Sequence, residues 1–432
     1  MQQGGLRLQC LPAVAENQPA NKNRMTSGLS YFAARLREAV LSEGRVTRGP
    51  DPELEIRNGC LWNSPLRDFN RLALELFGLQ FEHNAAYRKI CEARGLAPQV
   101  VEHWTQIPAV PTATFKELEL TCLPPSERIA AFHSSGTTGQ RPGRHFHNAE
   151  SLAVYEASLW PWFERHLLRS ADSLSVSSEK RGQAVRAPLV ILTPLPAQAP
   201  HSSLVHMFET VRQKMDAPES VFVGNIAADG SWTLDFDAVL VVLNSSPVTR
   251  LPAEALAKGG HPSLLLGTAF SFVHLLDFLG EKKLRFDLPA GSRVMETGGY
   301  KNRSRSMPKA ELHARITERL GVPPENIVCE YSMSELSSQA YDVKVRSGEC
   351  GVRSFHFPPW ARAQIISPET DREVAEGETG LIRVFDLANV FSVMAIQTED
   401  LATRCGDGFK LLGRAQLAEP RGCSLMSHSA LK

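Results

Sequence analysis

Short apolar runs without polar alternation occupy the middle of the chain and constrain its fold most strongly. Such runs are typical of strands buried on both faces, and the helical patterns between them are the crossovers that parallel strands need. The predicted strands cover residues 188–192, 238–243, 263–267 and 326–329, and the predicted helices cover residues 269–279 and 308–320. The pattern predicts an α/β fold with two mostly parallel sheets layered with helices.

The regions on either side of this central part differ from it in composition and in hydrophobic periodicity. Residues 1–24 are rich in Gln, Asn, Ala and Pro without hydrophobic periodicity, which predicts a disordered leader and makes Met25 an alternative start of the chain. Residues 29–94 show helical periodicity, whereas residues 351–414 contain short apolar segments bounded by Gly, Pro or Asp. The expected organisation is a leader over 1–24, an α/β core over 25–350, a small β subdomain over 351–414 and a flexible tail over 415–432.

Composition narrows the classes of function. The chain has 432 residues with 47 Lys plus Arg and 47 Asp plus Glu, so it lacks the basic excess of a nucleic-acid-binding protein. Its eight cysteines are scattered, without the short paired spacing of zinc sites, which is typical of free thiols in a reducing cytosol. We find neither a signal-peptide pattern nor an apolar run of membrane-spanning length. These features predict a soluble, cytoplasmic protein whose partners are small molecules or other proteins.

The sharpest local signal is the segment 132–143, Phe-His-Ser-Ser-Gly-Thr-Thr-Gly-Gln-Arg-Pro-Gly. Glycines among hydroxyl residues give a loop whose backbone N–H groups and hydroxyls can wrap a triphosphate at close range. An ordinary surface turn is the alternative, because Ser, Thr and Gly are also turn residues. The loop is not the common P-loop, since no Lys-Ser or Lys-Thr closes it. The candidate phosphate-binding residues are Ser134, Ser135, Gly136, Thr137, Thr138 and Gly139.

This loop resembles the phosphate loop of the adenylate-forming superfamily of acyl and aryl ligases, and three later segments follow in that superfamily's order. Residues 296–299, Glu-Thr-Gly-Gly, resemble the stretch that lies against adenine. Residues 331–336, Tyr-Ser-Met-Ser-Glu-Leu, resemble the motif whose glutamate helps to hold magnesium. Residues 397–401, Gln-Thr-Glu-Asp-Leu, with Arg414 farther on, resemble the segment whose aspartate binds both ribose hydroxyls and whose arginine follows near a hinge. Singly, each segment has an alternative as a turn, a helix start or a surface ion pair, but their shared order favours the superfamily.

The resemblance implies ATP and Mg²⁺ as cofactors. Attack of a carboxylate on the α-phosphorus develops charge on phosphate oxygens, which need fixed donors and a cation. Glu335 is a hard oxygen ligand of the kind that Mg²⁺ prefers. Asp400 would accept two charged hydrogen bonds from the ribose, each worth roughly 1.5–3 kcal/mol, and Arg414 is a catalytic candidate. The remaining nucleotide-binding candidates are Thr297, Gly298, Gly299, Tyr331, Ser332, Met333 and Ser334.

Two features depart from the superfamily pattern. A Lys usually follows the loop proline, whereas here Pro142 is followed by Gly143 and Arg144. Arg144 can supply the charge, although its planar fork differs from a point ammonium. Only residues 415–432 follow Arg414, so the mobile C-terminal domain that brings a second catalytic lysine is expected to be absent.

Further segments resemble the LuxE-type acyl-protein synthetases, the fatty-acid-activating subunit of the reductase complex that makes long-chain aldehyde in luminous bacteria. The resemblance runs from about residue 60 to the end and is carried by segments 81–88, 107–112, 115–116, 200–207, 266–270 and 421–426. It implies formation of an acyl-adenylate, transfer of the acyl group to a cysteine near the C-terminus, and hand-over to an acyl reductase. Cys423 is the acyl-bearing residue that the resemblance implies.

Other residues have a functional and a plainly structural interpretation. Candidates for the substrate pocket are His201, His206, Gly267 and Phe270. Hydrogen-bonded histidines and ordinary core packing are the alternatives for these positions. Inert packing thiols are expected at Cys91, Cys329 and Cys350.

Three functions remain open at the level of sequence. The leading one is an acyl-protein synthetase that loads a carboxylic acid, fatty by resemblance, onto its own cysteine and delivers it to a reductase. The second passes the activated acyl group to a carrier-protein thiol, coenzyme A or an amine. The third is a catalytically idle subunit that binds a nucleotide or acyl chain. The sequence leaves open whether the chain also forms a homo-oligomer.

Overall fold

A computed structural model describes residues 27–46, 66, 68–134, 141–168, 188–217, 219–245, 263–298, 307–344 and 353–415. The α-helices are α1 (Ser27–Val46), α3 (Phe69–His83), α4 (Ala85–Ala93), α5 (Thr114–Glu117), α6 (Ala149–Phe163), α8 (Ser203–Lys214), α9 (Phe236–Ser245), α10 (Ala269–Glu281) and α11 (Lys309–Leu320). Short helical turns cover Trp104–Gln106, Pro125–Glu127, Glu164–Leu168 and Pro324–Asn326. The strands are β1 (Val110–Pro111), β2 (Ala130–His133), β3 (Arg144–His147), β4 (Leu189–Ile191), β5 (Val221–Phe222), β6 (Gly224–Ile226), β7 (Trp232–Leu234), β8 (Leu264–Thr268), β9 (Arg293–Thr297), β10 (Ile327–Tyr331), β11 (Ala340–Lys344), β12 (Arg353–His356), β13 (Ala361–Ile366), β14 (Thr379–Asp386), β15 (Ala395–Cys405) and β16 (Gly408–Arg414).

The described strands form one twelve-stranded mixed sheet and two short hairpins, β2–β3 and β6–β7. The order is β13-β14-β15-β16-β12-β11-β10-β9-β8-β4-β5, with β1 paired to β15. Strands β4, β5, β8, β9 and β10 run parallel, whereas β11 to β16 pair antiparallel. The predicted α/β class is therefore confirmed, but the prediction of two mostly parallel sheets is corrected. After β10 the chain turns back and pairs Tyr331 with Ala340, which extends the same sheet in antiparallel sense.

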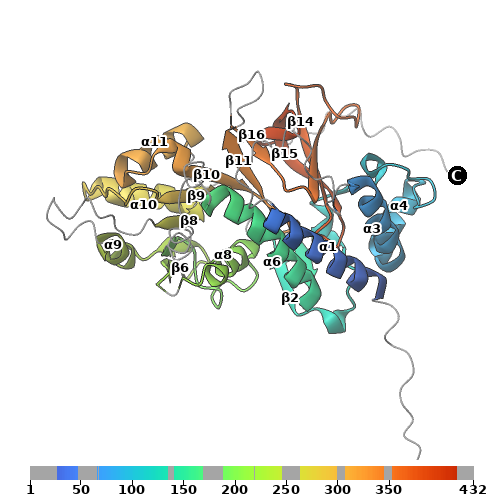
Figure 1. Cartoon of the computed structure of the whole chain (residues 1–432), viewed down its shortest axis with the longest axis horizontal. Coiled ribbons are helices and arrows are strands. Elements are labelled where there is room, and N and C mark those ends of the chain that lie inside the picture. Colours follow the sequence, from blue (N-terminus) through green and yellow to red (C-terminus); the bar gives the residue numbers. More distant parts are fainter. Residues whose placement is uncertain are drawn as a thin grey trace, which may run out of the picture.

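Helices cover both faces of the parallel half of the sheet, as its continuously apolar strands require. One face packs against α9, α10 and α11, where Val239, Leu276 and Ile316 share a core with the strands. The other face packs against α6 and α8, through residues such as Leu159 and Phe208. A third core joins α1, α3 and α4 to the antiparallel strands. Figure 1 shows α10 and α11 at one end of the molecule, α3 and α4 at the other, and α1 alongside α6 between them.

One predicted strand is wrong: residues 238–243 lie within the helix α9. The run Ala-Val-Leu-Val-Val-Leu has the β-branched composition of a strand, but its burial follows a helical period. Val239 and Leu243, four residues apart, are buried, whereas Val241 between them is 64% exposed. Asp235 also accepts a hydrogen bond from the backbone N–H of Ala238 at 2.9 Å, which satisfies a free donor in the first turn.

The other elements predicted in the middle of the chain are confirmed as β4, β8, β10, α10 and α11. Strand β8 passes directly into α10, whose first turn is capped by Thr268 through the backbone N–H of Ser271 at 3.0 Å. Within the described ranges, no helix is both long enough and apolar enough to cross a membrane.

Candidate active site

The predicted phosphate loop connects the two strands of the β2–β3 hairpin, and hydrogen bonds join its two ends. The backbone N–H of Ser134 donates to the Gly143 carbonyl at 3.0 Å, and the Gly143 N–H donates to Ser134 Oγ at 2.8 Å. Residues 135–140 lie outside the described residues, and these include the candidates Ser135, Gly136, Thr137, Thr138 and Gly139. The described structure therefore fixes the base of the loop.

Glu335 lies directly beside this base. A Cβ atom added to Gly143 would lie 3.0 Å from Ser134 Oγ, 3.2 Å from Glu335 Oε1 and 3.3 Å from Phe115 Cβ. A side chain at this position would force its neighbours to shift by a few tenths of an ångström, so glycine suits this close approach to the carboxylate. Glu335 is 5% exposed and accepts a hydrogen bond from Ser334 Oγ at 2.9 Å. The structure thus brings together two segments that lie almost 200 residues apart in sequence.

A second contact joins the Tyr331–Glu335 segment to Asp400. The Tyr331 hydroxyl, at the end of β10, donates to Asp400 Oδ2 on β15 at 2.9 Å. The backbone N–H of Asp400 donates to Thr398 Oγ1 at 3.1 Å, which holds the strand at this point. Burial, with the Asp400 carboxylate adding to it, raises the pKa of Tyr331 well above its ordinary value, so its hydroxyl keeps the proton that it donates.

Arg414 lies on β16 opposite Asp400 in the antiparallel register. Its guanidinium pairs with Glu399 at 3.0 Å, and its side chain is 66% exposed. An ion pair this exposed contributes only about 0–1 kcal/mol to stability. The structure places Arg414 at the margin of the candidate site.

Thr297 and Gly298, at the end of β9, lie beside β10. The Thr297 hydroxyl donates to the Glu330 carboxyl group, and the two residues are register partners. Because neighbouring residues of a strand face opposite sides of a sheet, Thr297 shares a face with Glu330 and not with Tyr331. Gly298 has a φ of +73°, a conformation that favours glycine at this turn. Gly299, the last residue of this predicted stretch, lies outside the described residues.

The middle of the Tyr331–Glu335 turn makes structural contacts. Met333 packs against the large core beneath the antiparallel strands, and its carbonyl accepts the backbone N–H of Leu336 at 3.1 Å. The carbonyl of Ser334 bonds His145 Nδ1 at 2.9 Å. Ser332 hydrogen bonds to Glu330 and lowers the pKa of that carboxyl group. The turn is therefore bonded both to the β2–β3 hairpin and to β10.

Arg144 does not face this site. His145 contacts Ser334, and the neighbouring side chain on a strand points to the opposite face. Arg144 instead pairs with Glu119 at 3.2 Å, with its guanidinium 5.2 Å from the centre of the Phe146 ring. This arrangement argues against the expectation that Arg144 replaces the loop lysine.

The histidines predicted for a substrate pocket are packed against the hairpin. His201 Nδ1 bonds the Ala131 carbonyl at 3.0 Å, and its ring stacks on His133 with 4.2 Å between ring centres. His206 lies between Phe132 and Tyr155, and burial lowers its pKa, so it is neutral at pH 7. These contacts agree with the structural interpretation of the two residues.

The two other pocket candidates differ from each other. A Cβ atom on Gly267 would lie 2.9 Å from Leu192 Cβ, which indicates a packing role in β8. Phe270, in the first turn of α10, contacts His274 with 4.1 Å between ring centres. A role for either residue in binding an acid stays a prediction.

The described cysteines fit the expectation of inert thiols. Burial raises the pKa of Cys91 to about 11 and that of Cys329 well above its ordinary value. Both thiols are therefore protonated at neutral pH and are poor nucleophiles. Cys350 and Cys423 lie outside the described residues.

Two buried acidic residues near the site were missed by the sequence analysis. Asp386 accepts the backbone N–H groups of Ser337 and Ser338 at 2.9 and 2.8 Å, and so positions the chain that follows Glu335. Glu330 lies within a buried strand, and desolvation raises its pKa to about 7. The available signal was an acidic residue inside the apolar run that begins at Ile327.

A magnesium ion fits the chemistry of this site, although the described residues contain no group of three or more His, Cys, Asp or Glu side chains arranged for a metal. Mg²⁺ commonly takes one or two protein carboxylates and completes its shell with phosphate and water. Glu335, next to the base of the predicted phosphate loop, supplies such a carboxylate.

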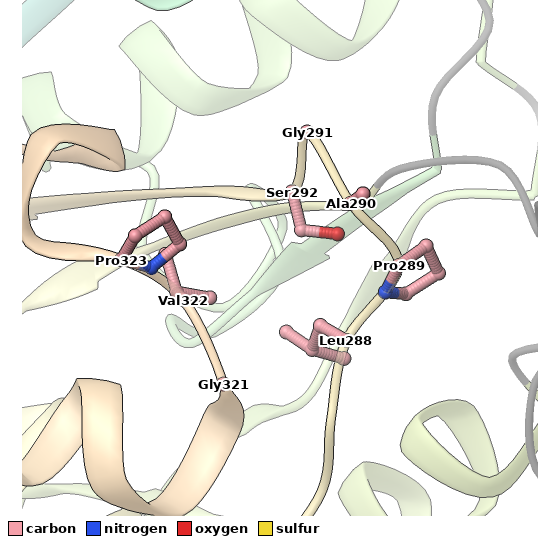
Figure 2. Close-up of a pocket in the computed structure, with 8 residues that line it drawn as sticks. All are labelled: Leu288, Pro289, Ala290, Gly291, Ser292, Gly321, Val322 and Pro323. Atoms are coloured by element: carbon pink, nitrogen blue, oxygen red, sulfur yellow. The ribbon is translucent and has the colours of Figure 1, made fainter.

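The pocket in Figure 2 lies at the other edge of the parallel strands. It is lined by residues 288–292 and 321–323, which precede β9 and β10. Thr297 and Tyr331 stand at the opposite, carboxyl ends of the same strands. Ligands of open α/β sheets bind at carboxyl ends, so this pocket is not a candidate for the active site.

The fold is that of the adenylate-forming ligases. The chain superposes on 2-hydroxyisobutyryl-CoA ligase in complex with 2-HIB-AMP and CoA with a TM-score of 0.54 at 16% identity, covering 81% of this chain and 69% of that one. An open conformation of the same enzyme gives a TM-score of 0.52 at 16% identity, with 78% and 74% covered. At this identity the likeness describes the fold alone.

Sequence comparisons point to one family within that class. Residues 232–432 match the model of the family "Acyl-protein synthetase, LuxE". The chain is 22% identical over 373 residues to the long-chain-fatty-acid–luciferin-component ligase of Vibrio harveyi, covering 84% of this chain and 87% of that one. The ligase of the same name from Aliivibrio fischeri is 26% identical over 140 residues, covering 32% and 35%. These matches confirm the resemblance to LuxE-type acyl-protein synthetases and the predicted enzyme class, a ligase.

Proposed function

We propose that the chain uses ATP to activate a carboxylic acid as its acyl-adenylate and then forms a thioester with Cys423. One observation supports the first half: Glu335 lies beside the base of the predicted phosphate loop, and Tyr331, four residues before it, bonds Asp400. These segments follow one another in the order of the superfamily's motifs. That order alone does not make them neighbours in the folded chain, so their proximity is an independent observation. The shared name of the relatives from Vibrio harveyi and Aliivibrio fischeri supports a long-chain fatty acid as the substrate.

In the first step, an oxygen of the substrate carboxylate attacks the α-phosphorus of ATP. The bond from the α-phosphorus to the bridging oxygen breaks, and pyrophosphate leaves with the electron pair. Backbone N–H groups of the loop that starts at Ser134 bind phosphate oxygens, which carry the developing charge. Glu335 would hold Mg²⁺, which supplies neutralising charge at the phosphates.

Asp400 holds the ribose in this scheme. An ionised carboxylate can accept about four hydrogen bonds, so the bond from Tyr331 is compatible with two more from the ribose hydroxyls. The Tyr331 bond also orients the carboxylate before the nucleotide arrives, which lowers the cost of ordering it on binding.

In the second step, the Cys423 thiolate attacks the acyl carbonyl, and AMP leaves with the electron pair of the anhydride bond. Thiolate is the most nucleophilic side chain at neutral pH, and Arg421 close by in sequence favours the charged form. The thioester then passes to a partner acyl reductase. This step rests on the family resemblance and on chemistry, because Cys423 lies outside the described residues.

Acid-dependent exchange of labelled pyrophosphate into ATP tests the first step. Glu335→Gln and Asp400→Asn should each lower the exchange rate by roughly tenfold or more, since each replaces charged contacts by neutral ones. Glu373→Gln is a matched control, because that glutamate pairs only loosely with Arg404 at 3.8 Å. Exchange that is equal in all four proteins would remove the reaction from this region.

Covalent labelling tests the second step. Cys423→Ser should keep acid-dependent exchange and lose the hydroxylamine-sensitive acyl label that the wild type acquires. Cys91→Ser is the control, because its buried thiol is protonated at neutral pH. A thioester label that persists on Cys423→Ser would place the acceptor elsewhere. A wild type that exchanges but never labels would favour direct transfer to a carrier thiol, coenzyme A or an amine.

A further inference from the structure

The segment that joins β14 to β15, residues 387–394, is buried along its whole length although it contains neither helix nor strand. None of its residues is more than 2% exposed. Connecting segments normally run over the surface, because buried backbone groups need the partners that a helix or a sheet would otherwise supply. The burial of this segment therefore needs side chains from elsewhere to bond its backbone.

Gln80 of α3 supplies such bonds at two places in the segment. Its Nε2 donates to the carbonyls of Asn389 and Val390 at 2.7 and 3.2 Å, and its Oε1 accepts the backbone N–H of Met394 at 3.0 Å. Gln80 is itself fully buried. A side chain more than 300 residues away in sequence thus fixes the backbone from which Asn389 extends.

Asn389 reaches from this segment to the candidate magnesium ligand. Its Nδ2 donates to the carbonyl of Glu335 at 2.8 Å and to that of Val393 at 3.1 Å. The two hydrogens of the amide are both used, and because both partners are acceptors, only this orientation of the amide fits. Asn389 therefore joins the backbone of Glu335 to the buried segment.

His145 of β3 bonds the carbonyl that directly precedes this one in the chain. Its Nδ1 lies 2.9 Å from the carbonyl of Ser334, which can only accept, so Nδ1 carries the hydrogen. The ring is buried, and burial lowers its pKa to about 4, so it is neutral at pH 7. Gly143, two residues earlier, lies against Glu335 Oε1. The chain that leaves the predicted phosphate loop therefore meets the Ser334–Glu335 segment at two points.

The backbone around Glu335 is thus bonded by side chains from three parts of the fold. His145 and Asn389 bond the carbonyls of residues 334 and 335, and Asp386, the last residue of β14, accepts the N–H groups of residues 337 and 338. Each of these side chains is at most 3% exposed. Bonds of this kind fix the main chain, and with it the place from which the Glu335 carboxylate extends.

We propose that His145 and Asn389 are positioning residues for adenylation, which hold Glu335 where its carboxylate binds Mg²⁺ beside the base of the phosphate loop. The inference rests on the proposed function, because Glu335 is a metal ligand only in that scheme. A carboxylate that is held in place before the metal arrives loses less freedom on binding. Removal of the groups that orient a metal ligand typically costs roughly 10–100-fold in metal affinity or activity. Both residues act through Glu335 and not on the reacting atoms.

Calorimetric titration with ATP, once in Mg²⁺ and once in EDTA and without any acid, tests the proposal. The ratio of the two dissociation constants measures how strongly metal and nucleotide favour each other's binding. The wild type should bind ATP more tightly in Mg²⁺. His145→Leu and Asn389→Leu should each lower the ratio by about tenfold, or to one, and change the dissociation constant in EDTA little, because the loop and Asp400 remain.

Two further variants separate hydrogen bonding from packing, and thermal unfolding checks that each protein is folded. His145→Asn keeps a donor close to the position of Nδ1, so it should retain most of the ratio that His145→Leu loses. Tyr87→Phe removes a buried bond to the Pro108 carbonyl at 2.8 Å and should leave the ratio unchanged. A ratio that falls equally in His145→Asn, or in Tyr87→Phe, would overturn the positioning role. The His145 variants decide the proposal where Asn389→Leu does not fold.

Pyrophosphate exchange keeps this inference apart from the proposed function. Acid-dependent exchange in the wild type, with a ratio that neither leucine variant lowers, overturns the inference and leaves the function standing. A ratio that depends on His145 and Asn389, in a protein that shows no exchange with any acid, supports the positioning role and contradicts the function. A wild type that binds ATP equally in Mg²⁺ and in EDTA contradicts the metal role of Glu335 and, with it, this inference.

Discussion

Replacing Glu330 by glutamine should stabilise the protein in a pH-dependent way. The pKa of this buried carboxyl rises from 4.5 to about 7, chiefly because burial penalises its charged form, with Glu296 adding to the effect and Ser332 and Thr297 opposing it. Tyr155 and Tyr341 are ionisable groups that also interact with Glu330. Burial raises the pKa of both hydroxyls, so they stay protonated and uncharged. Glutamine has a similar shape and no charged form to bury.

The magnitude of this stabilisation follows from the coupling between proton binding and folding. Between about pH 4.5 and pH 7 the folded carboxyl keeps a proton that the unfolded chain has lost, so the free energy of unfolding falls as pH rises through this window. A shift of about 2.5 units at about 1.4 kcal/mol each gives a loss of about 3 kcal/mol. The variant should therefore equal the wild type near pH 4.5 and exceed it by up to about 3 kcal/mol at pH 8.

Urea unfolding at several pH values between 4.5 and 8 measures this difference directly. Glu369→Gln, at an exposed turn, controls for the general effect of removing a negative charge. A gap between Glu330→Gln and wild type that does not widen from pH 4.5 to pH 8 would refute the assignment of a neutral, buried Glu330. A gap of opposite sign would indicate that an unrecognised cation pairs with the carboxylate.

Three further substitutions probe the nucleotide site. Asp400→Asn should weaken ATP binding by roughly tenfold or more in calorimetry, because neutral bonds replace charged ones, and unchanged affinity would exclude Asp400 from the ribose contact. Glu335→Ala should lower the adenylation rate and raise the Mg²⁺ concentration needed for half-maximal rate, whereas an unchanged magnesium titration would exclude it as a ligand. Gly143→Val should reduce exchange in a folded protein, since its side chain would meet Glu335 and Ser134, and full activity would show that this close approach is not needed.

The order of motifs led us to expect that segments far apart in sequence lie close together in space. Thr297 and Tyr331 stand at the carboxyl ends of adjacent parallel strands, of which the sequence analysis predicted β10 but missed β9. The contact between Gly143 and Glu335 and that between Tyr331 and Asp400 then agree with the resemblance. We expected these two proximities from the residue motifs and from their order in the family that the chain resembles.

The sequence predictions that the structure corrects concern features that depend on contacts between residues far apart in the chain. The apolar run of α9 has strand composition, and only the burial of Val239 and Leu243 together reveals a helix. The direction of Arg144 is set by the bond from its neighbour His145 to Ser334, almost 200 residues away. The continuity of the sheet depends on the antiparallel pairing of β10 with β11, which strand patterns alone do not specify.

Glu330 shows the same limit. In sequence it is one acidic residue in an apolar strand, with no motif of its own. Its significance comes from the registers that align it with Thr297 and Tyr341, and from the helices that exclude water from that face. Pairing registers are non-local, so a single sequence could not supply them.

The most direct test of the central claim identifies the products of the first step. The wild-type protein is incubated with ATP, Mg²⁺ and a carboxylic acid, quenched before turnover, and analysed by mass spectrometry for enzyme-bound acyl-AMP together with released pyrophosphate. Formation of acyl-AMP and pyrophosphate in equal amounts, only when the acid is present, is the predicted result. Release of ADP and phosphate, or ATP cleavage that ignores the acid, would contradict the adenylating function.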